Sequence, residues 1–133
     1  MAEVIAAVGV EAFYVAYMKA QLASRSETAR VATKVPAVRP VRMVRVSLID
    51  TVRQTLVHFY SRLLVECWAE SETEAAELAM LAYALTNALE GEVSSGEFVS
   101  QVVTVGGPAN NPDPDVGPRY QFTVDLLMTG AVI

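Results

Sequence analysis

The chain has 133 residues, a length that suits one domain and is short for two, so we expect residues 1–133 to form a single domain. Hydrophobic residues make up 53% of the sequence, yet no apolar run reaches the roughly 20 residues needed to cross a bilayer, and we expect a soluble protein with no membrane partner. Cys67 is the only cysteine, which excludes an intrachain disulfide and a cysteine-based zinc site.

Charge is divided unequally along the chain. Residues 1–66 contain nine Lys and Arg against five Asp and Glu, whereas residues 67–133 contain one against ten. Three explanations fit this division: a nucleic-acid-binding segment, two complementary faces that pair between copies, or two differently solvated faces of a monomer. The basic residues are spread over predicted strands and a helix and do not form a tail.

The first predicted element is a helix over residues 4–22, followed by a short strand within residues 28–35 that ends at Pro36. Apolar side chains recur in the helix at helical spacing and would form one buried face. This face consists of Val8, Ala12, Val15 and Leu22, widened by Phe13 and Tyr17. Gly9 lies inside the segment and disfavours its first turn.

Two strands are predicted next, over residues 41–49 and 59–68. In the second, Ser61, Leu63, Val65 and Cys67 share one face, and Arg62, Leu64, Glu66 and Trp68 share the other. Residues 50–58 between them fit either an irregular loop or an extension of the hairpin.

A second helix follows. Ser71 and Glu74 have the spacing of a capping box, and Gly91 is a typical C-terminal stop. The apolar face consists of Leu78, Leu81, Ala82, Leu85 and Leu89. This pattern predicts an amphipathic helix between residues 71 and 91.

The last part of the chain predicts strands over residues 98–105 and 120–128, separated by a loop at 106–118 that is rich in proline and glycine. In the final strand Tyr120, Phe122, Val124 and Leu126 share one face. The order of elements predicts an α+β fold, with a mixed, mostly antiparallel sheet of about four to five strands covered on one face by two helices.

Few residues suggest chemistry. His58 is the only histidine, and Cys67 lies in an apolar strand where a buried, inert thiol is expected. Asp113 and Asp115 lack the spacing of an EF-hand loop and favour a proline-stiffened turn. No phosphate-binding glycine motif is present. We therefore expect no enzyme activity, no catalytic residue, no cofactor and no metal.

The sequence also resembles a known family. The run VGGPANNPDPD at residues 105–115 and the run PRYQFTV at 118–124 are similar to the C-terminal part of tail terminators from siphophages of actinobacteria. PVRMVRV at 40–46 and LLVECWA at 63–69, followed by a Glu/Ala-rich helix, are similar to the preceding part of that family. The resemblance extends from about residue 31 onward, and the order of the motifs makes it more specific than any one of them.

The resemblance implies a small α+β subunit of a hexameric ring. Such a ring caps the tail tube, stops its polymerisation and joins it to the head connector or stopper protein. It implies a structural virion protein of the tail and neck, assembled in the host cytoplasm, which meets DNA only as it passes through the lumen. The resemblance carries over no catalytic residue.

We expect ten residues to contact neighbouring subunits or the tube, and we choose them by their charge and their position in loops, not by the family resemblance. They are Arg39, Arg42, Arg45, Arg53, Arg62, Asn110, Asn111, Asp113, Asp115 and Arg119. Arginine suits such contacts because its planar fork can bind a carboxylate with two hydrogen bonds. The alternatives are another head–tail connector or stopper, a small α+β enzyme, and a nucleic-acid-binding accessory protein, for which the acidic net charge is unfavourable.

Overall fold

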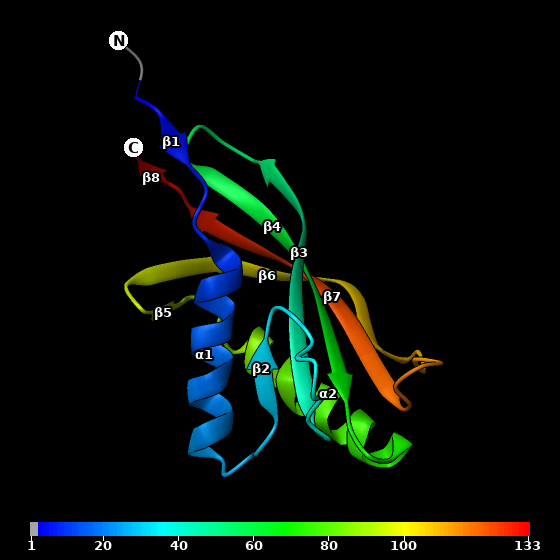
Figure 1. Ribbon diagram of the computed structural model, residues 1–133. Helices are drawn as coiled ribbons and strands as arrows, with labels where there is room; N and C mark the ends of the chain where they lie inside the picture. Colours follow the sequence, from blue (N-terminus) through cyan, green and yellow to red (C-terminus); the bar gives the residue numbers. More distant parts are fainter. Residues whose placement is uncertain (1–2) are drawn as a thin grey trace.

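The computed structural model describes residues 3–133 and has an α+β fold (Figure 1). A six-stranded sheet has the strand order β2-β3-β4-β7-β6-β5, and β1 pairs with β8 in a separate two-stranded sheet. In chain order the elements are β1 (Ile5–Ala6), α1 (Val10–Ser24), β2 (Arg30–Ala32), β3 (Met43–Arg53), β4 (His58–Trp68), α2 (Glu72–Asn87), β5 (Glu92–Ser94), β6 (Glu97–Asn110), β7 (Arg119–Thr129) and β8 (Ala131–Val132).

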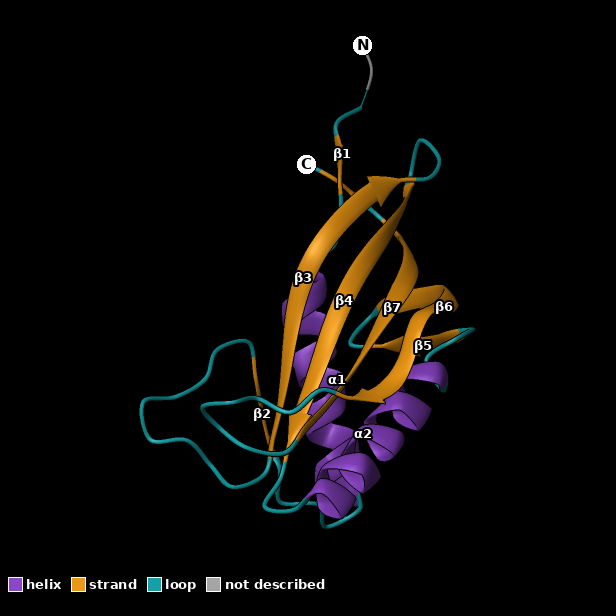
Figure 2. Ribbon diagram, turned by 90° about the vertical axis from the view of Figure 1, so that its right-hand side faces the viewer, coloured by secondary structure: helices purple, strands orange, loops and turns teal. Residues whose placement is uncertain are grey.

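The main sheet is mixed and curled. β2 runs parallel to β3, and all other neighbouring strands pair antiparallel. Both helices lie on the same side of this sheet (Figure 2). The predicted class, with two helices on one face of a mixed sheet, is confirmed, but the count of four to five strands is wrong because β5, β1 and β8 are too short to leave a pattern in the sequence.

The core lies between the helices and the inner face of the sheet. The predicted alternation in β4 is confirmed: Ser61, Leu63, Val65 and Cys67 are buried on the side of the helices. In β7 Phe122, Val124 and Leu126 fill the same layer. None of the helices within residues 3–133 is long and apolar enough to span a membrane.

The first helix differs from its prediction. It begins at Val10, after Gly9, and not at residue 4, because Ile5 and Ala6 form a strand with Val132 and Ala131. Its buried face also differs, since Tyr14 and Met18 are fully buried while Ala12 is exposed. Phe13 and Leu22 of the predicted face are buried, so the prediction was wrong in including Ala12 and in missing Tyr14 and Met18. The helix is apolar nearly all round, and spacing alone does not identify every side chain that packs.

The second helix agrees with its prediction. The Ser71 hydroxyl accepts a hydrogen bond from the Glu74 backbone N–H at 3.2 Å, which caps the N-terminus. Leu78, Leu85 and Leu89 are buried. The helix ends at Asn87, before the predicted stop, and Gly91, whose φ of +76° favours glycine, lies in the turn that follows.

Two segments are more regular than expected. Residues 50–58 extend the hairpin, because β3 continues to Arg53 and β4 begins at His58. β6 continues through Gly106 and Pro108 to Asn110, with irregular register against β7, so the connecting loop comprises only residues 111–118. Pro108 is compatible with this strand because β6 is at the sheet edge beyond β5, where no outer partner needs its missing N–H.

The small β1–β8 sheet is attached to the end of the β3–β4 hairpin. The Gly130 backbone N–H donates to the Val57 carbonyl at 2.6 Å. A Cβ at Gly130 would lie 2.5 Å from the Ala6 carbonyl oxygen and 2.6 Å from Cε1 of Phe59. Only glycine therefore allows this close approach between the chain ends and the hairpin.

Candidate interaction surface

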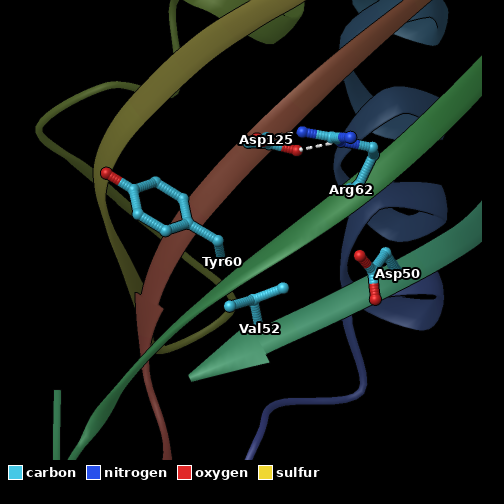
Figure 3. Close-up of a pocket in the computed structure, with 5 residues that line it drawn as sticks. All are labelled: Asp50, Val52, Tyr60, Arg62 and Asp125. Atoms are coloured by element: carbon cyan, nitrogen blue, oxygen red, sulfur yellow. Dashed lines mark hydrogen bonds and ion pairs between the residues drawn. The ribbon is translucent and has the colours of Figure 1, made fainter. Parts of the chain in front are cut away.

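The face of the sheet opposite the helices carries charged side chains from three adjacent strands. Asp50 of β3 pairs in register with Arg62 of β4, which pairs in register with Asp125 of β7. These residues, with Val52 and Tyr60, line a hollow of about 210 Å³ (Figure 3). We refer to this side of the sheet as the open face.

Arg62 and Asp125 form the centre of that hollow. The Arg62 Nε donates to Asp125 Oδ1 at 2.9 Å, and an Arg62 terminal nitrogen donates to Oδ2 at 3.1 Å, as Figure 3 shows. This fork raises the pKa of Arg62 above its ordinary value. Because a guanidinium has five N–H donors, those that Asp125 does not use remain for a carboxylate or carbonyl of a partner.

A second charged cluster lies at the other end of the open face. Glu66 is buried there and accepts a hydrogen bond from Arg119 at 2.9 Å, while Arg45 lies 3.6 Å away on its other side. The Arg119 guanidinium also lies over the Trp68 ring at 5.7 Å. Two arginines therefore neutralise one carboxylate at the boundary between sheet and loop.

The loop at residues 111–118 is fixed by polar contacts. Arg119 Nε donates to the Asn111 carbonyl at 2.9 Å, and the Asn111 amide donates to Gln121 at 2.9 Å. Asp113 accepts the Asp115 backbone N–H at 3.0 Å, so its carboxylate is engaged within the turn. This geometry agrees with the proline-stiffened turn that the sequence favours.

Arg42 and Glu27 form a separate ion pair between the α1–β2 connection and the start of β3. Two Arg42 nitrogens donate to the two Glu27 oxygens at 3.0 and 2.6 Å. These hydrogen bonds hold the pKa of Glu27 below its ordinary value and raise the pKa of Arg42.

The expected contact residues thus divide into four groups, one of which is Arg42 alone, paired with Glu27. Arg45, Arg62 and Arg119 all lie on the open face, Arg62 in one cluster and Arg45 with Arg119 in the other, and each pairs with a carboxylate of its own chain. Asn110 donates to Glu72 at 2.8 Å and, with Asn111 and Asp113, belongs to the loop and its base. Arg39 and Arg53 are exposed and form no ion pair within residues 3–133, and Asp115 is exposed at the turn.

Glu66 and Asp125 are not among the contact residues expected from the sequence, although they are the acceptors on the open face. Arg62 and Asp125 are 63 positions apart, and Arg119 and Glu66 are 53 apart. The sequence does mark these two residues as unusual, because each is a carboxylate on the side of an alternating strand that faces away from the core. Without the register between β4 and β7, that signal does not identify the partner.

His58 and Cys67 do not form a pair. They lie at opposite ends of β4, and nine residues of extended chain separate them by roughly 30 Å. Burial raises the pKa of the Cys67 thiol, as expected for a structural cysteine. Within residues 3–133, no three His, Cys, Asp or Glu side chains gather to hold a metal ion.

The two outer strands of the main sheet differ in charge. β2 begins with Arg30, and Lys19 of α1 lies beside it along a groove. At the other edge, β5 begins with Glu92, and β6 begins with Glu97. These four side chains take part in none of the ion pairs found in the part of the chain that the structure describes. One edge is therefore basic and the other acidic.

Comparison with known proteins does not assign a family. No protein-family model matches the chain, and no curated protein matches it.

Proposed function

We propose that this protein is a structural subunit of a ring that ends the tail tube of a long-tailed bacteriophage. The motifs similar to tail terminators support this proposal, and they lie in β3, in β4 and its continuation into α2, and in the β6–β7 region. The segments of resemblance therefore belong to the sheet that carries the open face.

The observation that carries the proposal is the unlike charge of the two sheet edges. A closed ring of identical subunits needs two different, complementary patches on each subunit, because its contacts run head to tail. Arg30 at one edge and Glu92 at the other provide charges of opposite sign, and neither forms an ion pair within residues 3–133.

Further surfaces remain for the tube and the head connector. At the end of the molecule formed by β1, β8 and the β3–β4 hairpin, Leu56 and Ile133 are exposed by 74% and 79%. Large exposed apolar side chains that gather at one place are typical of protein contacts. In this proposal the ring acts in the virion, at the junction of tail and neck, and DNA passes through its lumen.

Purified protein incubated with growing tubes of the tail-tube protein tests the proposal. We expect the protein to bind tube ends and stop elongation, so that negative-stain images show shorter tubes with a ring at one end. Tubes that keep growing at the same rate and carry no ring would contradict it.

The same preparation, incubated with portal-bearing heads, tests the alternative of a connector or stopper. That alternative predicts rings on the head vertex and none on the tube. Binding to tube ends first, and to heads only through a finished tail, is expected for a terminator.

A further inference from the structure

A groove runs along the basic edge of the sheet, between α1 and β2. Its volume is about 520 Å³. Ala12, Val15 and Val31 provide apolar lining, and Lys19 and Arg30 are exposed at its border. Glu11 also lines the groove, but its carboxylate is engaged by the Leu48 backbone N–H at 2.8 Å. The groove therefore favours a peptide segment whose apolar side chains are flanked by acidic side chains.

At the opposite edge of the sheet, β5 and β6 form a small hairpin that carries both exposed apolar and acidic side chains. β5 and β6 join through Ser95 and Gly96, both with positive φ, as in the tight turns of two-residue hairpins. Val93 and Phe98 lie directly opposite each other on it and are exposed by 65% and 46%. Exposed apolar side chains paired across two strands are unfavourable in water and point to a contact.

Acidic side chains border this apolar pair. Glu92 precedes Val93 and Glu97 precedes Phe98, so alternation along the strands places the carboxylates on the other face of the hairpin. A hairpin laid into the groove with its apolar pair toward the apolar lining would keep both carboxylates on its outer side, from which the long Glu side chains would reach over the strands to cations at the border. Lys19 and Arg30 occupy that border on the other edge of the sheet.

We infer that the β5–β6 hairpin of one copy binds the α1–β2 groove of the next copy. The inference rests on the proposed ring and names the contact that closes it. The hairpin cannot enter the groove of its own chain, because β2 and β5 form opposite edges of one sheet with four strands between them (Figure 2). The contact is therefore intermolecular and head to tail.

Charge reversal tests the contact, with the mass of the assembly measured by sedimentation velocity and native mass spectrometry. The groove variant carries Lys19→Glu and Arg30→Glu, and the hairpin variant carries Glu92→Lys and Glu97→Lys. Each variant alone places like charges at every contact, and we expect at least about tenfold weaker assembly than for the wild type.

An equal mixture of the two variants should assemble again, since each groove then meets a hairpin of opposite charge. The resulting ring alternates the two chains and has an even number of subunits. A single chain with all four substitutions should also assemble. These rescues show that the variants are folded, and Arg25→Glu with Glu77→Lys, two exposed charges outside the groove and the hairpin, is the matched control.

The outcomes separate this inference from the proposed function. If the wild type assembles and neither variant is impaired, or if the mixture and the fourfold variant both remain monomeric, the contact is wrong while the ring stands. If the wild type stays monomeric at high concentration and ignores tube ends, the proposed function fails as well.

Discussion

Arg119 and Glu66 lie on neighbouring strands, 53 positions apart in the chain, and their side chains meet at 2.9 Å. Glu66 is almost fully buried, and the two arginines beside it offset the cost of burying a carboxylate. The same guanidinium holds the Asn111 carbonyl. One side chain thus connects the sheet to the loop that carries residues 111–115, the end of the run similar to tail terminators.

We predict that Arg119→Ala lowers the free energy of unfolding by about 2–3 kcal/mol, because it leaves a buried carboxylate with one distant partner and frees the loop. Urea denaturation measures the change. Arg119→Lys should recover only part of the loss, since an ammonium cannot reproduce the planar fork. A loss for Arg119→Ala no larger than that for Arg53→Ala, an exposed arginine without an ion pair, would contradict the prediction.

A second prediction concerns acid stability through Glu27. Its folded pKa lies below the unfolded value because Arg42 hydrogen-bonds the carboxylate. The pair therefore stabilises the fold fully above the unfolded pKa, and this contribution is lost as pH falls through the folded pKa. We expect Glu27→Gln to lower stability by about 1–2 kcal/mol at pH 7.

The difference between wild type and Glu27→Gln should shrink as the pH is lowered from about 5 toward 2, where both proteins carry a neutral side chain at this position. Urea unfolding at several pH values measures it. Glu70→Gln, at an exposed carboxylate without an ion pair in residues 3–133, is the control. A difference that stays constant across this range would contradict the assigned role of the pair.

A third prediction concerns the hydrogen bond between Tyr14 of α1 and Thr86 of α2. The Thr86 hydroxyl donates to the Ala82 carbonyl at 2.7 Å, so its oxygen must accept the proton of the Tyr14 hydroxyl, 2.8 Å away. Tyr14→Phe removes a donor and leaves Thr86 bonded to Ala82, for a loss of about 1 kcal/mol. Thr86→Val leaves the buried Tyr14 hydroxyl without an acceptor, for about 2–3 kcal/mol.

Chemical denaturation of both single variants and of the double variant measures this asymmetry. Because the double variant has no unpaired hydroxyl, it should be more stable than Thr86→Val alone. Equal losses for the two single variants would show that the bond does not have the assigned direction.

A fourth prediction concerns Gly130. Its replacement by alanine places a methyl group against the Ala6 carbonyl oxygen and Phe59. We expect a loss of about 1–3 kcal/mol from overpacking and faster hydrogen exchange at residues 5–6 and 131–132. Gly107→Ala, where a methyl group would contact nothing within 4 Å, should change neither measurement.

The sequence was sufficient for the elements whose two faces differ in polarity. β4 and α2 have alternating or helical patterns with clear ends, and both lie where the pattern predicts. α1 is apolar on several sides, so its buried face depends on what packs against it. β5 has three residues, which is too short for any periodicity.

The candidate surfaces were harder to predict because they depend on register. The basic residues of the open face were selected from the sequence, but their acceptors come from strands far along the chain. The groove at β2 combines residues 11–19 with residues 30–33, and its shape depends on how a helix lies against an edge strand. No local pattern encodes that arrangement.

The pairing of β1 with β8 places the first and last described residues at the same end of the molecule, beside the tip of the β3–β4 hairpin (Figure 1). A fluorophore or gold label fused at either end would therefore project from one site. In a cyclic assembly equivalent positions lie on a single circle, so labels from all copies would form one belt, and the number of labels in that belt would give the number of subunits directly.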